Sequence, residues 1–395
     1  MSRTPRLTVT IAAYNAAKWL PVALESCLWQ SLPEIEAVVV DDGSTDDTAR
    51  IAAHYAARDE RVRLVRQENA GAAKARAAGL AHARGEYLIW LDADDFLDRH
   101  AAREMIATAD RDGVDMVCGN AVVFSELTFN ARRYFHHPPD SGLTFDEPRY
   151  WKSKVCWRWM FRTAFLRERE MVHIPLARGE DVCFMFSALC QVRRFSQSPH
   201  LFYYFRQDHK GMGSRVDIEV EHDIGHFVHA RRILLQAGRI KPLIKYLTEN
   251  YFRNIKKMMP RIAAAGEHWV QRTADISLEI FEGLDPRWFT AEYLAPELSA
   301  EPEFVPLAEA LIARDRERVL AELRAWSERR AHAPEVDKKS TLHLLRRRVK
   351  AFLNPLSHMA RRRLRELEAR AFKRLRTMAD APEAATRPTT TGGTG

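Results

Sequence analysis

Four short segments rich in Val, Ile and Leu alternate with longer segments whose apolar residues recur every three or four positions. The short segments are LTVTIAA (7–13), EAVVV (36–40), RVRLV (61–65) and YLIWL (87–91). Such runs are typical of buried strands, and the spacing between them is typical of amphipathic helices. Strand and helix in alternation predict a parallel sheet with right-handed crossovers. The start of the chain therefore predicts an α/β fold.

The pattern changes after residue 110. We expect further strands at 115–124 and 199–206 and a buried helix at 182–192, which makes the sheet mixed. Helical periodicity dominates from 216 to about 330 and is broken at prolines. The predicted organisation is an α/β region over 1–215, a helical domain over 216–333, a basic tail over 334–379 and a disordered end over 380–395.

Polar side chains follow each of the four predicted strands. They are Tyr14 and Asn15, Asp41 and Asp42, Asn69, and the cluster Asp92, Asp94 and Asp95. Ligands of parallel sheets bind at the carboxyl ends of the strands. Three carboxylates at one strand end repel one another unless a cation neutralises them, and oxygen ligands suit Mg²⁺ or Mn²⁺. Asp92 and Asp94 are therefore candidate metal ligands for a metal-bound diphosphate. The alternative is that these acids only cap the following helix.

Two turns near these strand ends carry further ligand candidates. In VVVDDGSTDDT, Gly43 permits a tight turn, and Asp41 is placed to accept a hydrogen bond from a base or ribose. In QENAGAAKARAAGL, Asn69 lies at a turn and Arg76 lies on the following helix, where a cation can meet phosphate charge. A solvated turn and a basic helix face are the alternatives. Neither a dinucleotide fingerprint nor a P-loop follows the first strand.

With these residues in view, the chain resembles the family 2 glycosyltransferases, which are inverting enzymes of the GT-A fold. The resemblance covers residues 6–215 and is carried by IAAYN, VVVDDGSTDDT, QENAGAAKARAAGL, YLIWLDADDF, KVCWRWMFRTAFL, RGEDVCFMFSAL and YYFRQDHKGMGSR. It implies a Rossmann-like nucleotide-binding domain with a mixed central sheet. It also implies transfer of a sugar from a nucleotide-sugar, usually a UDP-sugar, to an acceptor hydroxyl with Mn²⁺ or Mg²⁺ as cofactor.

The resemblance also implies roles for individual residues. For the nucleotide-sugar these are Ala12, Tyr14, Asp41, Asn69, Arg76, Asp92, Arg206 and Ser214, and for the metal Asp94, Asp92 and His209. A solvent-facing His209 is the open alternative. Relatives commonly have proline at Ala12, asparagine at Ala77 and glycine at Arg178. These departures leave the carboxylates untouched but weaken any inference about the sugar.

Glu180 and Asp181 directly precede the predicted helix at 182–192. An acceptor hydroxyl is a poor nucleophile at neutral pH, so a carboxylate must take its proton during attack. Asp181 matches the catalytic base of the family, and we expect Glu180 to orient the acceptor. An ordinary acidic first helical turn is the alternative interpretation.

Aromatic and sulfur-containing residues carry less information. Trp151, Trp157 and Trp159 could stack on an acceptor sugar ring, although core packing is favoured. The five cysteines include no CxxC pair, so we expect small buried hydrophobes rather than disulfides or a zinc site and assign them no chemistry.

The net charge of +8 belongs to one segment. Residues 338–376 hold 14 Lys or Arg and two acids, while the rest of the chain is slightly acidic. Apolar residues at helical spacing here predict amphipathic helices on an anionic membrane surface. A bundle contact with a protein partner is the alternative. We expect no nucleic-acid partner, because the rest of the chain is slightly acidic.

No uncharged segment reaches the roughly 20 residues needed to span a bilayer, and no signal peptide is recognisable. The expected location is therefore the cytoplasm, peripheral at the inner face of the plasma membrane. The expected acceptor is a glycan or a lipid-linked glycan of a bacterial surface polysaccharide. Three alternatives remain: a non-catalytic nucleotide-sugar or glycan-binding protein, a membrane-associated scaffold, and a nucleotidyltransferase, although the last lacks the expected phosphate loop.

Overall fold

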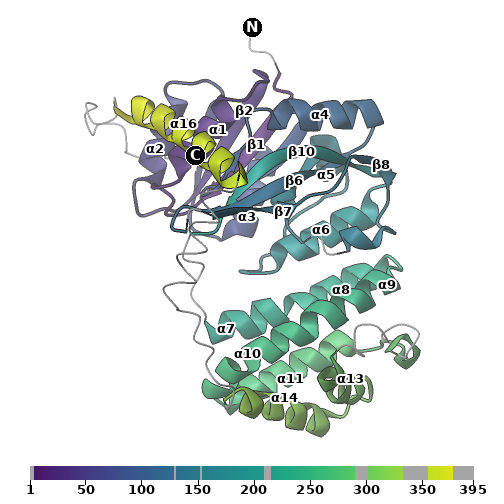
Figure 1. Cartoon of the computed structure of the whole chain (residues 1–395). Coiled ribbons are helices and arrows are strands. Elements are labelled where there is room, and N and C mark those ends of the chain that lie inside the picture. The colour runs from purple at the N-terminus through teal and green to yellow at the C-terminus, as the bar shows by residue number, and fades with distance from the viewer. Residues whose placement is uncertain are drawn as a thin grey trace, which may run out of the picture.

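A computed structural model describes residues 4–128, 130–151, 154–208, 215–289, 301–331 and 355–376. Within them, ten strands form one mixed sheet (Figure 1). The main order is β3-β2-β1-β4-β9-β6-β10-β5, with β7 on β6 and β8 on β10. The expected α/β fold with a mixed sheet and a helical C-terminal region is confirmed.

The first four strands lie close to their predicted positions and are parallel to one another. The strands are β1 (Leu7–Ala13), β2 (Ile35–Asp42), β3 (Val62–Gln67), β4 (Tyr87–Asp92), β5 (Phe96–Leu97), β6 (Met116–Ser125), β7 (Asn130–Phe135), β8 (Asp140–Leu143), β9 (Trp159–Arg162) and β10 (Phe195–Arg206). Strand β9 is antiparallel to both β4 and β6, which makes the sheet mixed. The strands predicted at 115–124 and 199–206 correspond to β6 and β10.

The helices of the α/β region cover both faces of the sheet, and a stack of helices follows it. The helices are α1 (Leu20–Leu28), α2 (Thr48–Ala56), α3 (Ala72–His82), α4 (Ala101–Asp112), α5 (Thr163–Glu168), α6 (Glu180–Gln191), α7 (Val216–Ile218), α8 (His226–Gln236), α9 (Ile240–Tyr246), α10 (Phe252–Ala264), α11 (Glu267–Phe281), α13 (Val305–Ile312), α14 (Arg316–Ala331) and α16 (Pro355–Leu375). Figure 1 shows α8 to α14 as a layer on one side of the α/β region, with α6 between them.

One apolar cluster runs through α6 from the sheet into the helical layer. It includes Trp90 on β4, Phe184 on α6, Phe227 on α8 and Tyr251, all buried. The other face of the sheet packs α1 and α4 against β1 and β4 in a second cluster. Because α6 belongs to the continuous cluster, its first turn is held from both the sheet and the helical layer.

Helix α16 returns to the α/β region, beside α1 and β7 (Figure 1). Its apolar residues Ala360, Leu364 and Leu367 pack against Val22 of α1 and Phe96 of β5. Over 355–376, the apolar stripe of the predicted basic tail therefore packs against the α/β region of the same chain and is not free to enter a bilayer. The remainder of the tail and the end over 380–395 lie outside the described residues.

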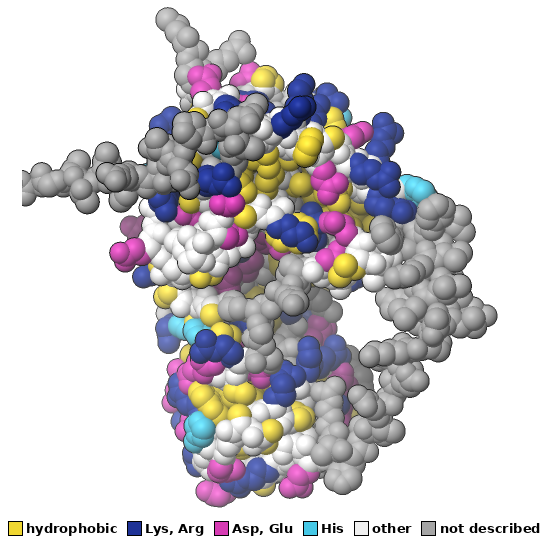
Figure 2. Space-filling model, turned by 90° about the vertical axis from the view of Figure 1, so that its left-hand side faces the viewer, with side chains coloured by type: hydrophobic (Ala, Val, Ile, Leu, Met, Phe, Trp, Pro, Cys, Tyr) yellow, Lys and Arg dark blue, Asp and Glu magenta, His cyan; other side chains and the backbone are white. Residues whose placement is uncertain are grey.

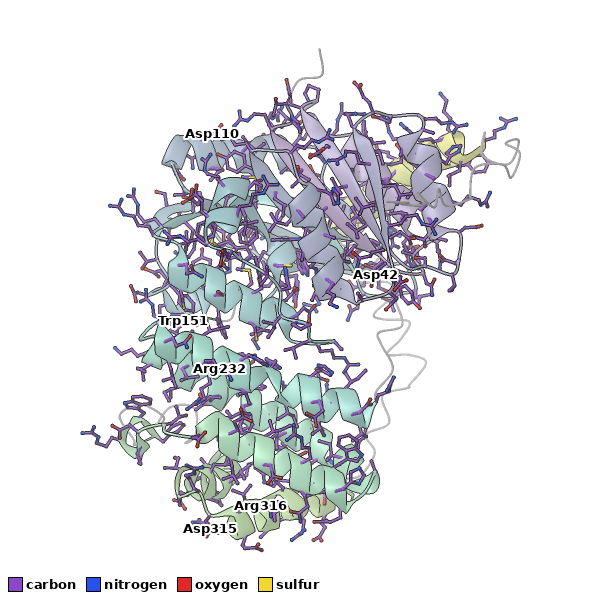
Figure 3. All side chains as sticks on the ribbon, turned by 180° about the vertical axis from the view of Figure 1, so that it is seen from behind. Asp42, Asp110, Trp151, Arg232, Asp315 and Arg316 are labelled. Atoms are coloured by element: carbon purple, nitrogen blue, oxygen red, sulfur yellow. The ribbon has the colours of Figure 1, made fainter. Side chains whose placement is uncertain are left out.

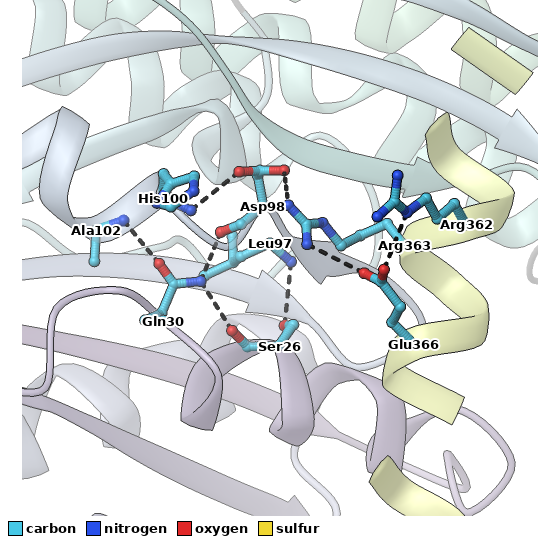
Figure 4. A network of polar contacts seen from close by, with 9 residues as sticks. All are labelled: Ser26, Gln30, Leu97, Asp98, His100, Ala102, Arg362, Arg363 and Glu366. Carbon is cyan, nitrogen blue, oxygen red and sulfur yellow. Dashed lines mark hydrogen bonds and ion pairs between the residues drawn. The ribbon is translucent and has the colours of Figure 1, made fainter. Parts of the chain in front are cut away.

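Polar contacts reinforce this docking. Arg363 pairs with Asp98 at 3.2 Å, and its other nitrogen lies 3.3 Å from Glu366 (Figure 4). Arg374 pairs with the buried carboxylate of Glu25 at 2.9 Å. Asp98 follows β5 directly, so α16 supports the segment that continues from the Asp92 cluster. In the part of the chain described here, no helix combines the length and the apolar character needed to cross a membrane.

Candidate active site

The carboxyl ends of β1, β2 and β4 meet at one edge of the sheet. Ala12 is paired with Asp92 in the register of β1 and β4, and Ala13 is paired with Asp41 in that of β1 and β2. Figure 3 shows Asp42 at the edge of the α/β region that faces the helical layer, opposite Asp110. Figure 2 shows a hollow between these two parts with acidic side chains in it.

The three aspartates after β4 divide into two kinds. Asp92 and Asp94 are partly exposed, whereas Asp95 is fully buried. The Tyr203 hydroxyl and the Arg206 amide donate to Asp95 at 2.8 and 2.7 Å. Burial and the charges of the neighbouring aspartates raise its pKa well above the ordinary range. Asp95 thus anchors the turn, and Asp92 and Asp94 remain at the crevice as oxygen-only ligand candidates.

The two aspartates ending β2 are likewise distinct. Asp42 accepts hydrogen bonds from Gln67, Ala70 and Gly71 and so holds the turn before α3. Asp41 is also buried, but its Oδ2 accepts no hydrogen bond and lies 3.4 Å from Arg66. A buried acceptor without a donor is costly unless a ligand supplies one. Asp41 therefore fits the predicted contact with a base or ribose.

The remaining nucleotide candidates lie around this edge. Tyr14 is 53% exposed, and Asn69 is exposed at the turn after β3. Gly43 has a φ of 72°, and a Cβ there would lie 2.7 Å from the Asn69 amide nitrogen. The predicted tight turn is confirmed, and it brings the ends of β2 and β3 together.

Arg76 joins the strand end to α6. Its guanidinium contacts Glu180 at 2.8 Å, Asp181 at 3.0 Å and Asp92 at 3.2 Å. Burial alone would lower the pKa of Arg76, but the surrounding carboxylates raise it well above its usual value. Arg76 is thus a buried counter-ion shared by three acids, a role that the sequence did not predict. Its contact with the nucleotide remains a prediction.

Glu180 and Asp181 form the first turn of α6, after Gly179 in the left-handed conformation. Burial, together with the charge of Asp181, raises the pKa of Glu180 from 4.5 to about 7. Burial also acts to raise the pKa of Asp181, but the charge of Arg76 outweighs it and lowers that pKa. Asp181 is therefore ionised at neutral pH and able to accept a proton, whereas Glu180 is near its midpoint.

Two further residues contact Asp181 that sequence reasoning missed as site residues. The Cys156 thiol lies 3.2 Å from Asp181 Oδ1, and His173 Nε2 lies 3.4 Å from the same atom. Both side chains are buried. No motif spacing links positions 156, 173 and 181, so only the position of Cys156 within KVCWRWMF offered a signal. All five cysteines are free, as expected.

The helical layer contacts the loop before α6. Arg178 pairs with Asp223 at 2.6 Å, and the Ala177 amide donates to His222 at 3.3 Å. A Cβ on Gly179 would lie 2.4 Å from the ring of His226 on α8. Because only glycine fits this close approach, the start of α6 is set by the helical layer as well as by Arg76.

Arg206 points into the protein rather than into open crevice. Its side chain donates to the Asp94 carbonyl at 2.7 Å, packs over Trp19 at 4.3 Å and pairs with Glu126. Burial lowers the pKa of Arg206. In this arrangement Arg206 fixes the backbone of Asp94, and a phosphate contact remains a prediction. His209 and Ser214 lie outside the described residues.

Two of the three tryptophans pack in the core, as the sequence favoured. Trp157 is buried and stacks on Tyr203 at 4.3 Å, and Trp159 is buried against Phe195. Trp151 is partly buried and lines a cavity of about 570 Å³ with Trp288. Only Trp151 thus has a face near open space, and no observation ties it to the acceptor.

Comparison with known proteins gives consistent matches. Residues 8–170 match the family model of glycosyl transferase family 2. The glycosyltransferase YibD of Escherichia coli (strain K12) is 36% identical over 256 residues, which cover 60% of this chain and 73% of YibD. ExoO, a succinoglycan biosynthesis protein of Rhizobium meliloti (strain 1021), is 33% identical over 52% of this chain and 62% of ExoO.

The glycosyltransferase EpsH of Bacillus subtilis (strain 168) is 29% identical over 51% of this chain and 61% of EpsH. The chain thus spans somewhat less than two thirds of the length of EpsH and ExoO. The crystal structure of Staphylococcus aureus TarS 1–349 matches with a TM-score of 0.66 and 19% identity, covering 85% of this chain and 95% of that chain. A complex of TarS 1–349 with UDP-GlcNAc matches with a TM-score of 0.62. At this identity the likeness shows the fold.

Proposed function

The chain belongs to glycosyltransferase family 2, and from that premise we propose that it transfers a sugar from a UDP-sugar to an acceptor hydroxyl with inversion, in the synthesis of a bacterial surface polysaccharide. The acceptor in this proposal is a glycan or a lipid-linked glycan. The UDP-sugar donor is supported by the TarS complexes with UDP and UDP-GlcNAc, and polysaccharide synthesis by the description of ExoO.

A single observation carries the proposal. The buried guanidinium of Arg76 contacts Asp92 at the end of β4 and both acids of α6, so the donor-side and acceptor-side carboxylates border one crevice. A displacement reaction needs such proximity, because the hydroxyl must attack while the diphosphate leaves on the opposite side. Asp181, ionised beside Arg76, would take the hydroxyl proton. Glu180 would orient the acceptor.

The donor-side residues fit a hard divalent ion. Asp92 and Asp94 offer oxygen ligands at partly exposed positions, and burial and the charge of Asp94 raise the pKa of Asp92 in spite of Arg76. A bound Mg²⁺ or Mn²⁺ would offset the negative charge that develops on the leaving diphosphate. Asp41, whose Oδ2 accepts no hydrogen bond and lies 3.4 Å from Arg66, would accept from the base, and Tyr14 and Asn69 would contact the nucleotide from the ends of β1 and β3.

The experiment measures release of UDP and binding of UDP separately. In Asp181→Asn we expect transfer to fall by roughly 10²- to 10⁴-fold while UDP affinity stays within about twofold, because only the proton acceptor is lost. Glu180→Gln is the matched variant and should raise the KM for the acceptor more than it lowers kcat. If Asp181→Asn weakens UDP binding as much as it slows transfer, Asp181 has a donor role and the assignment of the base is wrong.

A thermal-shift panel of nucleotide-sugars tests the donor and the metal together. A UDP-sugar with Mn²⁺ should raise the Tm most, since a ligand stabilises in proportion to the logarithm of its saturation. Asp94→Ala should remove the additional shift due to Mn²⁺. Absence of free nucleotide from every donor and acceptor tested would favour a non-catalytic binding protein instead.

Membrane association is proposed through the outward face of α16. Since its apolar stripe packs on the chain itself, the surface left for an anionic bilayer at the inner face of the membrane is cationic. It carries Arg362, which is 84% exposed, Phe372, which is 73% exposed, and Arg365, Lys373 and Arg376. Arg362→Glu with Arg365→Glu should abolish sedimentation with phosphatidylglycerol vesicles. Equal binding to phosphatidylcholine vesicles would contradict this proposal.

A further inference from the structure

A cluster of three different ligand types surrounds the proposed base. Cys156 Sγ, His173 Nε2 and an oxygen of Asp181 all lie within 4.8 Å of one another. The cysteine precedes β9, the histidine lies between α5 and α6, and the aspartate is in the first turn of α6. Three chain segments therefore place one sulfur, one nitrogen and one oxygen around a common point.

The surroundings of His173 also indicate a bound ligand. His173 is 6% exposed, and its Nε2 is directed at Asp181 Oδ1 at 3.4 Å but makes no well-aligned hydrogen bond. Its ring stacks on Phe184 at 4.1 Å with an interplanar angle of 4° and meets the edge of Trp90. Packing thus holds the ring in place, and a buried nitrogen whose hydrogen bonding is poorly satisfied is costly.

Two of the three ligand distances match tetrahedral coordination, and the third, between Cys156 Sγ and His173 Nε2, is within 4.8 Å. With bonds of about 2.3 Å to sulfur and about 2.0 Å to nitrogen and oxygen, tetrahedral ligands lie roughly 3.3–3.5 Å apart. The Asp181 oxygen lies 3.2 Å from the Cys156 sulfur and 3.4 Å from the His173 nitrogen. Three protein ligands and one open position are the arrangement of an accessible zinc site. Here the Asp181 side chain is 17% exposed, which leaves an approach from the crevice.

We propose that Cys156, His173 and Asp181 form a binding site for a thiophilic divalent cation such as Zn²⁺, and that the bound ion silences the enzyme by occupying its base. Binding would convert the Cys156 thiol to the thiolate and release its proton to solvent. A thiolate and an imidazole favour Zn²⁺ over Mg²⁺, so this site differs in chemistry from Asp92 and Asp94. The cysteine for which the sequence suggested no role thus acquires one.

Arg76 limits the affinity of this site. Its guanidinium lies 3.0 Å from the same Asp181 oxygen, so an incoming cation must displace it or share that oxygen. Arg76 keeps Glu180 and Asp92 as partners when Asp181 turns to the metal. The expected affinity is therefore that of a reversible inhibitory site rather than a permanent structural one.

Metal binding is tested without any donor or acceptor, by titrating the full chain with Co²⁺ as a spectroscopic substitute for Zn²⁺. We expect one equivalent to produce a thiolate-to-cobalt charge-transfer band that Zn²⁺ removes. Cys156→Ser and His173→Gln should each lose or strongly weaken the band. Cys183→Ser is the matched control, because this buried thiol is on α6 but points to the His226 carbonyl. It should keep the band, and so should Asp94→Ala.

No band in the natural chain, or an undiminished band in Cys156→Ser, would overturn the site. If Cys156→Ser fails to fold, as judged by circular dichroism, His173→Gln decides the question through the same titration. An undiminished band in His173→Gln would then exclude the site.

Inhibition rests on the proposed role of Asp181, whereas binding does not. With Mg²⁺ in excess, micromolar Zn²⁺ should reduce transfer by at least about tenfold in the natural chain and in Cys183→Ser, and a zinc-selective chelator should restore it. The ratio of activities with and without Zn²⁺ should approach one in His173→Gln. If Zn²⁺ binds but transfer continues, the inhibitory role is wrong and Asp181 is not the base, while the metal site stands.

Discussion

The crevice and the docking face of α16 are both networks of arginines and carboxylates, but their charges are balanced differently. In the crevice, one buried guanidinium serves Asp92, Glu180 and Asp181. On α16, Arg363 lies against Asp98 and Glu366, Arg374 lies against Glu25 and Asp59, and both arginine side chains are partly exposed. Three partly buried carboxylates around one buried guanidinium are costly and mark a site made for cations and protons, whereas the ion pairs of partly exposed arginines on α16 hold a helix in place.

The largest effect should follow removal of the shared counter-ion. Arg76→Ala should lower the free energy of unfolding by about 3–5 kcal/mol, because it leaves three acids in the crevice without their cation. Transfer should be lost as well. Urea denaturation measures the change, and Lys74→Ala, on the exposed side of the same helix, is the control. A loss below about 1 kcal/mol would show that solvent already screens these acids.

A smaller loss is expected where α16 packs. Leu364→Ala should cost about 2–3 kcal/mol, since a buried leucine against Val22 and Phe96 leaves a cavity. Arg365→Ala, on the exposed face of the helix, should be nearly neutral. Limited proteolysis should also release α16 earlier in the first variant. Unchanged stability in Leu364→Ala would mean that α16 contributes little to the fold in solution.

The stability of the crevice should also depend on pH through Glu180. Glu180 has a folded-state pKa of about 7 against 4.5 for the free side chain, so its contribution is fully present below pH 4.5 and is lost as the pH rises through about 7. Glu180→Gln should therefore be more stable than the natural chain at pH 8, by roughly 1–2 kcal/mol, and nearly equal at pH 5. Thermal unfolding at both pH values measures this. Parallel curves would exclude the raised pKa.

The smallest effect is expected from an ion pair of α16. Arg363→Gln should cost about 0.5–1 kcal/mol, because the pair with Asp98 is partly exposed and screened by salt. The cost of Arg363→Gln should be smaller still in 0.5 M NaCl, because the Debye length falls to about a few ångströms at this ionic strength. A cost comparable to that of Arg76→Ala would mean that the two networks do not differ in kind.

Local sequence predicted the elements that depend on local pattern. β1 has the predicted bounds, and β2, β3 and β4 differ from theirs by one or two residues. The helix predicted at 182–192 is α6, which begins two residues earlier, at Glu180. Alternating apolar runs and acids at strand ends are properties of neighbouring residues, so they can be recognised in one sequence. The motifs were specific enough to identify the family, which the comparisons confirm.

Only the tertiary structure decided which distant residues meet. Arg76 and Glu180 are 104 positions apart, and Arg363 and Asp98 are 265 apart. The apolar stripe of α16 looks the same in sequence whether it covers a bilayer or its own sheet, and packing against Phe96 settled which. Likewise, burial turned Arg206 inward and brought Cys156 and His173 to Asp181. Periodicity and residue chemistry are local properties of the sequence, whereas shared charges arise only where segments that are distant in the sequence meet in the fold.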